Sequence, residues 1–121
     1  MNNFNAQNTQ VLEIKTSKGI KYISQNRIVY IKAENKGTNI NLNNSEKVYT
    51  KHLLKWYNKY LKSPIFFRCH NSYIVNCIDV ECHCSSEIIL KEQIRIPLSR
   101  NKKQSFKENL ILLEKVMFCN K

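Results

Sequence analysis

Residues 66–76 read FFRCHNSYIVN, and residues 96–100 read IPLSR. The apolar start of the first stretch predicts a short extended segment over residues 65–68. Residues 71–76 predict either a bend or one turn of helix. Because Tyr73, Ile74 and Val75 are aromatic or β-branched, we expect them to lie in the core.

The second stretch belongs to a longer alternating pattern over residues 94–98. Alternation of this kind is typical of a strand with one buried face. Pro97 has no backbone amide to donate, so the strand is expected at the edge of a sheet. Residues 78–84 and 87–90 are two further strands. A final helix, capped by Ser99 or Asn101, would bury a stripe of Phe106, Leu110, Leu113 and Met117.

Upstream, short apolar runs are separated by Gly, Asn and Ser. Five strands are predicted from these runs, over residues 11–16, 20–24, 27–33, 38–42 and 47–50. Gly19 and the Asn35-Lys36-Gly37 tripeptide mark two of the turns, because these residue types tolerate a positive φ.

The period of the pattern then changes to that of a helix. Apolar residues recur at Leu53, Leu54, Tyr57, Tyr60 and Leu61. This predicts a helix with Thr50 as its N-cap, ending at Ser63-Pro64. Lys51, Lys55 and Lys59 would form a ridge on another face of that helix. The ridge either contacts phosphates or only keeps the helix in solvent.

The pattern as a whole predicts a mainly β fold with two helices and antiparallel sheets. A chain of 121 residues is long enough for one ordinary core. We expect a disordered arm over residues 1–10 and a single domain over residues 11–118. The hydrophobic fraction of 42% excludes a disordered chain, and no apolar run approaches the roughly 20 residues of a membrane span. The polar N-terminus lacks the apolar core of a secretory signal.

The charge gives the first indication of function. Twenty Lys and Arg residues against nine Asp and Glu give a net charge of +11. Residues 47–78 and 100–107 contain basic residues and no acidic ones. Acid-free basic segments favour a polyanionic partner over a uniform excess of lysine.

The cysteines invite a metal or catalytic interpretation. There are five, an odd number, which favours free thiols in a reducing cytoplasm. Cys77, Cys82 and Cys84 lack the spacing of a zinc site, so we expect them to be buried thiols packed as small apolar groups. No nucleophile, base and orienting acid come together in the sequence, so we expect no enzyme activity, no cofactor and no metal.

Residues 66–76, followed by Ile96–Arg100 in the pattern Ile-Pro-Leu-Ser-Arg, resemble the LytTR family of bacterial DNA-binding domains. The resemblance covers roughly residues 11–116. It implies an elongated antiparallel β fold that lies along DNA, with loops and a helix start entering successive major grooves. It also implies a cytoplasmic transcription regulator of the response-regulator type, either standalone or excised from a longer chain.

Carried over by position, the resemblance places base reading at the loop of Lys36, Gly37 and Thr38, at Asn71, and at Arg100. The full set of expected DNA contacts is Lys36, Gly37, Thr38, Arg68, His70, Asn71, Ser72, Arg100, Asn101, Lys102 and Lys103.

The chemistry of these residues agrees with that assignment. The planar guanidinium of Arg100 can grip guanine O6 and N7, and Asn71 can pair with adenine or a phosphate. Lys102 and Lys103 suit phosphates. Arg68 either braces the fold or touches a phosphate, and His70 more plausibly holds the loop than binds a ligand.

We therefore expect sequence-specific binding to duplex DNA, with a second copy on tandem half-sites and with no membrane and no small-molecule substrate. The alternative is a module that binds RNA or single strands, which needs exposed aromatic side chains on a sheet.

Overall fold

The β-hairpin that opens the fold pairs β1 (Val11–Thr16) with β2 (Gly19–Ser24) in antiparallel register. The computed structural model describes residues 10–119, so nearly all of the arm predicted over residues 1–10 lies outside the described residues. The chain divides into two compact units between Tyr60 and Leu61. In the hairpin, Leu12, Ile14 and Ile23 are buried on one face, as the alternation predicts.

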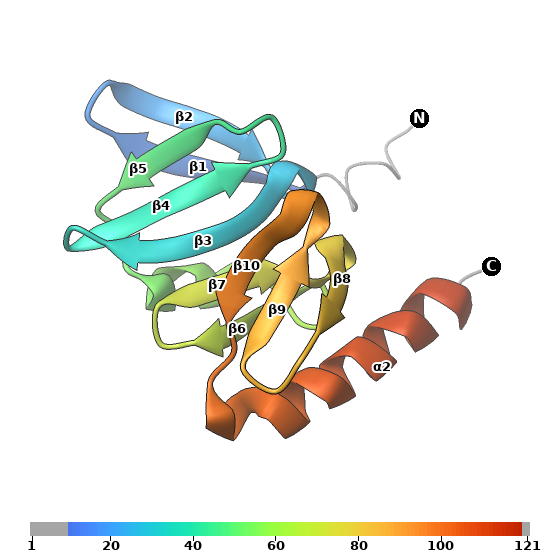
Figure 1. Ribbon diagram of the computed structural model, residues 1–121. Coiled ribbons are helices and arrows are strands. Elements are labelled where there is room, and N and C mark those ends of the chain that lie inside the picture. The colour runs from blue at the N-terminus through green and yellow to red at the C-terminus, as the bar shows by residue number, and fades with distance from the viewer. Residues whose placement is uncertain (1–9, 120–121) are drawn as a thin grey trace. The chain divides into compact units, whose positions relative to one another are not determined.

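The rest of the first unit is a three-stranded antiparallel meander of β3 (Ile28–Glu34), β4 (Gly37–Leu42) and β5 (Lys47–Thr50). A short 3₁₀ turn, η1 (Gln25–Arg27), leads into it. Ile40 in the middle strand lies opposite Ile31 on one side and Val48 on the other, and all three side chains are buried. The predicted strands of this half are all present (Figure 1).

The predicted helix after β5 is wrong in type and length. The segment is a 3₁₀ helix, η2 (Leu54–Lys59), and its buried residues are Leu54 and Tyr57, three apart. A spacing of three fits 3₁₀ geometry, and Leu53, which the α-helical pattern would bury, is 60% exposed. Thr50 is not the N-cap, because Leu53 holds that position, and Leu53 has no side chain that could make a capping bond.

The lysine ridge does not form either. Lys51 precedes η2, and at three residues per turn the positions of Lys55 and Lys59 are rotated by roughly 120° from each other. These three exposed lysines are named the lysine segment below.

The second unit begins with the hairpin of β6 (Phe66–His70) and β7 (Tyr73–Asn76). Residues 71–76 are therefore a strand preceded by a two-residue turn, rather than a bend or helical turn throughout. Ile74 and Val75 are buried as expected, and Tyr73 is half-buried.

A second antiparallel sheet of this unit has the order β10–β9–β8. Its strands are β8 (Val80–His83), β9 (Glu87–Leu90) and β10 (Ile94–Pro97). The short turn η3 (Cys77–Asp79) leads into β8, and η4 (Lys91–Gln93) joins β9 to β10. The strand that contains Pro97 lies at the edge of this sheet, as predicted.

The chain ends in η5 (Arg100–Lys102) and the helix α2 (Lys103–Cys119), the one α-helix of residues 10–119. Phe106 is fully buried against Phe67 and His83, with ring centroids 5.5 and 5.2 Å away. The predicted stripe stops early, because Met117 is 52% exposed.

A buried polar residue also anchors the first half of α2. Asn109 is buried, donates to the Pro64 carbonyl at 2.9 Å and to Cys77 Sγ at 3.4 Å, and accepts from the Ser63 hydroxyl at 2.6 Å. The hydrogen bonds of Asn109 together with the buried Phe106 therefore fix the first half of α2 in the second unit, directly after η5.

Candidate nucleic-acid interface

The turn between β6 and β7 presents Asn71 and Ser72 between two side chains that hold the backbone. The Arg68 guanidinium donates to the Asn71 carbonyl at 2.7 Å. Nδ1 of His70 accepts from the Ser72 amide at 3.0 Å, and the His70 ring packs edge-on against Tyr73. The turn is thus held from both sides, which leaves the Asn71 side chain exposed.

His70 fits the role of loop support. Its Nδ1 is used as an acceptor from the backbone, so that nitrogen carries no proton in this geometry. Within residues 10–119, no group of three or more His, Cys, Asp or Glu side chains is arranged to hold a metal ion.

A second exposed segment lies at the start of η5. Arg100 and Asn101 are exposed, Lys102 is half-buried and Lys103 is exposed. The first turn holds no acidic residue, and the Lys102 amide donates to the Ser99 carbonyl at 2.9 Å. Ser99 occupies the N-cap position, but its side chain makes no capping bond.

One backbone hydrogen bond ties the two segments together. The Ser99 amide donates to the Cys69 carbonyl at 2.9 Å, so the residue before Arg100 is bound to the strand that leads into Asn71. Cys69 Sγ also donates to the Pro97 carbonyl at 3.5 Å. We name the resulting group of side chains the Asn71–Arg100 surface; it comprises Arg68, Asn71, Ser72, Arg100, Asn101, Lys102 and Lys103.

The thiol beneath this surface is well covered. Burial raises the pKa of Cys69 to about 12, although the charge of Lys102 acts in the opposite direction. Cys77 is buried too, and burial raises its pKa to about 12. The prediction of packed thiols is wrong for Cys82 and Cys84, which are exposed at the end of β8.

The predicted reading loop of the first unit is a tight turn between β3 and β4. Asn35 and Lys36 have φ values of 55° and 62°, which fits a two-residue hairpin turn that requires positive φ at both central positions. The Tyr49 hydroxyl donates to the Asn35 carbonyl. A Cβ at position 37 would lie 2.2 Å from the Thr50 carbonyl oxygen, so only glycine fits there.

Of the three residues predicted to read DNA in this loop, only Lys36 is presented to solvent. Gly37 is buried, and Thr38 has 0% exposure. The Thr38 hydroxyl donates to the His52 carbonyl and lies 2.8 Å from the Tyr57 hydroxyl. Thr38 and Gly37 therefore shape the turn: the Thr38 side chain faces the interior, and Gly37 leaves the space that a Cβ would fill.

Two residues that the sequence did not indicate support this loop. Tyr49 reaches the turn from β5, and Tyr57 meets Thr38 from η2. Burial raises the pKa of Tyr57 to about 12, so its phenol stays protonated and remains a hydrogen-bonding group. Neither long-range contact leaves a local pattern in the sequence.

Taken together, these features define a mostly β domain that presents basic turns and a basic helix start. The chain matches the model of the LytTr DNA-binding domain over residues 18–111, and it belongs to the LytTR family. Domains of this family are DNA-binding output domains of response regulators, which act in transcription regulation, and the fold is a known non-enzymatic one.

A solved structure shows the same architecture. It is the LytTr DNA-binding domain of a Bacillus cereus protein described as a methyl-accepting/DNA response regulator. The two chains are 25% identical with a TM-score of 0.71, over 83% of this chain and 95% of the other. No curated protein matches this chain. Both the resemblance and the mainly β fold class predicted from the sequence are thereby confirmed.

None of the helices within residues 10–119 is long and apolar enough to cross a membrane.

Proposed function

We propose that this chain binds duplex DNA at a specific sequence, as part of a bacterial transcription regulator, through the Asn71–Arg100 surface and the Lys36 turn. The observation that carries the proposal is the bond from the Ser99 amide to the Cys69 carbonyl. It joins the two backbone segments that carry an exposed arginine and an exposed asparagine. Base reading needs donors in defined positions, because a base edge is recognised by direction as well as by charge.

Within this surface the residues divide by chemistry. Arg100 has the fork that discriminates guanine, and Asn71 can pair with adenine, so these two are proposed as base readers. Lys102, Lys103 and Lys36 are point charges that suit phosphates and set the position of the protein on DNA. Asn101 and Ser72 contribute polar contacts beside them.

Arg68 and His70 are proposed as positioning residues. Both are engaged with the backbone of the 71–72 turn, so their main effect on binding is to hold Asn71 in place. Gly37 and Thr38 have the same indirect role at the Lys36 turn, since both are buried.

The turns and the start of η5 would enter major grooves, and α2 would not act as a recognition helix. Its first half is held in the second unit by Phe106 and Asn109, which supports this view. A second copy on a tandem half-site is part of the proposal, because a single small surface reads few base pairs.

The test is selection of bound duplexes from a random pool, followed by affinity measurements on the selected site over a range of salt concentrations. We expect a steep fall of affinity with salt, with a slope of about −0.9 per phosphate contact. Equal affinity for selected and random duplexes contradicts specific reading.

A single-stranded and an RNA probe of the same sequence complete the experiment. On the strands, Tyr22 is 66% and Tyr49 37% exposed, but Phe66 is buried, so the sheets do not present the row of exposed aromatic rings on which bases stack. Tighter binding to either probe than to the duplex favours the alternative module.

A further inference from the structure

The first unit contains a pocket that the proposed DNA contacts do not use. It lies where the end of β1 meets the end of β5, and its volume is about 460 Å³. That is within the range of about 300–1,000 Å³ usual for sites that hold small molecules. The lining residues are Lys15, Thr16, Ser17, Tyr49, Thr50, Lys51 and His52.

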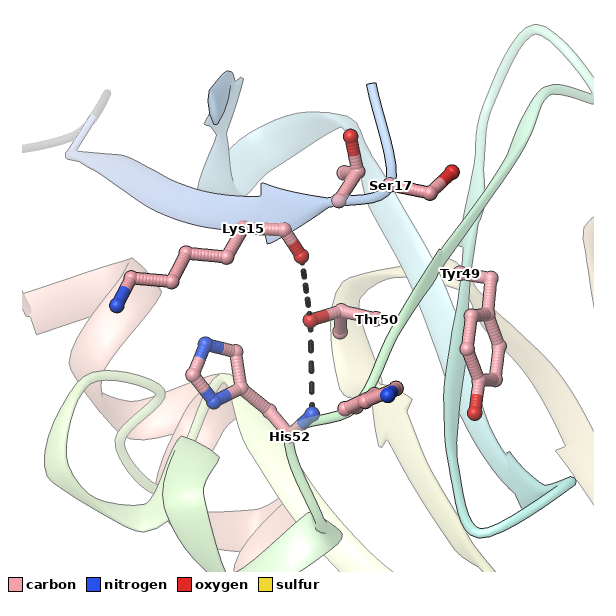
Figure 2. A pocket seen from close by; sticks show the side chains of 7 residues that line it. Lys15, Ser17, Tyr49, Thr50 and His52 are labelled. Atoms are coloured by element: carbon pink, nitrogen blue, oxygen red, sulfur yellow. Dashed lines mark hydrogen bonds between the residues drawn. The ribbon is translucent and has the colours of Figure 1, made fainter. Parts of the chain in front are cut away.

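One buried hydroxyl joins the two sides of the pocket. Thr50 Oγ1 donates to the Lys15 carbonyl at 2.8 Å and accepts from the His52 amide at 3.5 Å (Figure 2). The His52 ring is further fixed by stacking on Trp56, with centroids 3.8 Å apart and planes 8° apart. The shape of the pocket is therefore set by hydrogen bonds and ring packing.

The lining carries positive charge and hydrogen-bond donors but no carboxylate. Lys15 and Lys51 supply ammonium groups and Ser17 a hydroxyl, whereas the Thr16 hydroxyl already donates to the Gly19 carbonyl at 2.8 Å. Neither lysine has a carboxylate within ion-pair distance in the part of the chain that the structure describes. The nearby Glu46 is engaged by Lys21 and Arg27.

His52 is half-buried in this lining and lies within the electrostatic influence of Lys15. Partial burial, with the positive charge of Lys15 as a second cause, lowers the pKa of His52 below its usual value. Figure 2 shows the Lys15 side chain extending toward the imidazole. Glu13 lies on the same exposed face of β1 as Lys15, two residues before it, and is the closest acidic residue along that strand.

We propose that this pocket binds a phosphate group. Two ammonium groups, the Ser17 hydroxyl and an imidazole that gains a proton more easily beside an anion form a donor set that matches phosphate oxygens. The phosphate belongs either to a phosphorylated small molecule or to the DNA backbone. The proposal rests on the pocket alone and holds whether or not the Asn71–Arg100 surface reads bases.

The first experiment titrates inorganic phosphate into the full chain at constant ionic strength, with chloride as the balancing ion, and follows amide and histidine resonances by NMR. We expect saturable shifts confined to residues 15–17 and 49–52 and a rise in the pKa of His52. His70 and His83 serve as internal controls, because both lie in the other unit. Linear shifts spread over all lysines overturn the proposal, since they indicate general charge screening.

Variants separate the pocket from surface charge. Lys15→Ala and Lys51→Ala should each weaken phosphate binding about tenfold, the loss expected for one charge-assisted hydrogen bond. Lys59→Ala removes the same charge from an exposed position of the same unit that does not line the pocket, and it should have no effect. Equal effects of all three variants overturn the proposal.

A final arm distinguishes the two sources of phosphate. If the DNA backbone occupies the pocket, added duplex should compete with inorganic phosphate, and the Lys15→Ala/Lys51→Ala double variant should lower the salt slope of DNA binding by about 2. If a phosphorylated small molecule occupies it, duplex should leave the phosphate titration unchanged. Either result supports a phosphate site, and absence of saturable phosphate binding overturns it.

Discussion

The Asn71–Arg100 surface and the lysine segment are both basic and exposed, but they differ in the bonds made to the backbone that carries their side chains. In the first, the Arg68 guanidinium, the His70 ring and the Ser99 amide each bond to the backbone around the exposed residues. In the second, Lys51, Lys55 and Lys59 are exposed, and η2 turns Lys55 and Lys59 to different sides.

The difference shows what separates reading from attraction. A lysine ammonium offers a point charge that any phosphate satisfies, whereas the planar guanidinium of Arg100 offers a fork of donors whose geometry can match a base edge. Net charge alone does not distinguish the Asn71–Arg100 surface from the lysine segment, since both are basic. The backbone bonds around Asn71 and Arg100 make that surface the candidate for sequence recognition.

The largest expected effect concerns Cys69, which lies under the Asn71–Arg100 surface. Burial raises its pKa to about 12, against 9.0 for an unperturbed thiol, while hydrogen bonds from the Ser86 and Glu87 backbone lower the pKa of the exposed Cys84. At pH 8, iodoacetamide should label Cys84 at least about 10³-fold faster than Cys69, because the thiolate is the reactive form.

Peptide mapping by mass spectrometry measures both rates in one sample, and unfolded protein provides the control in which all cysteines react. Labelling of Cys69 as fast as Cys84 would show that the surface opens readily and is not held as described.

The next effect is that of Arg100 on affinity. Arg100→Ala should lower affinity for the selected duplex about 10- to 100-fold, which corresponds to about 1–3 kcal/mol. Arg100→Lys should recover only part of the loss, because an ammonium cannot reproduce the fork. Fluorescence anisotropy at fixed salt measures both variants. Full recovery by lysine would reduce Arg100 to a phosphate contact.

Arg68 should have a smaller and different effect. Arg68→Met removes the hydrogen bond to the Asn71 carbonyl and should lower duplex affinity about fivefold, or about 1 kcal/mol. As a positioning residue it should leave the salt slope unchanged. A slope that falls by about 0.9 shows instead that Arg68 touches a phosphate.

The smallest effect is expected in the lysine segment. Lys55→Ala should change affinity less than about twofold and equally for every duplex, because Lys55 is exposed and held by no bond that fixes its direction. Lys102→Ala is the matched comparison: the same charge is removed from the Asn71–Arg100 surface, and the salt slope should fall by about 0.9. If Lys55→Ala changes the slope as much as Lys102→Ala, the two regions do not differ as proposed.

The sequence predicted the strands well because alternation is a local property. The strands around Ile40 and Ile96 follow directly from it. The helical periodicity after β5 predicted the wrong type of helix, because Leu54, Tyr57 and Tyr60 fit a period of 3.0 residues as well as one of 3.6. The burial of Leu54 and Tyr57, three residues apart, favours the 3₁₀ helix.

The site was predicted less completely, because burial depends on contacts between distant residues. Thr38 was expected to face DNA, but the Tyr57 hydroxyl and the His52 carbonyl take up its hydroxyl. Cys82 and Cys84 were expected inside, but β8 leaves them exposed. Arg100 and Asn71 came from the resemblance, and the bond between Ser99 and Cys69 that joins their segments could not be read from either motif.

The central claim is that Arg100 reads a base, and one measurement tests it most directly. The affinities of the unmodified chain and of Arg100→Ala are measured on the selected duplex and on every single-base variant of it, at one salt concentration. We predict that Arg100→Ala removes the preference at one base pair and leaves the preferences at the others. A loss by the same factor on every duplex contradicts the claim and makes Arg100 a phosphate clamp, with base reading left to Asn71 or to the Lys36 turn.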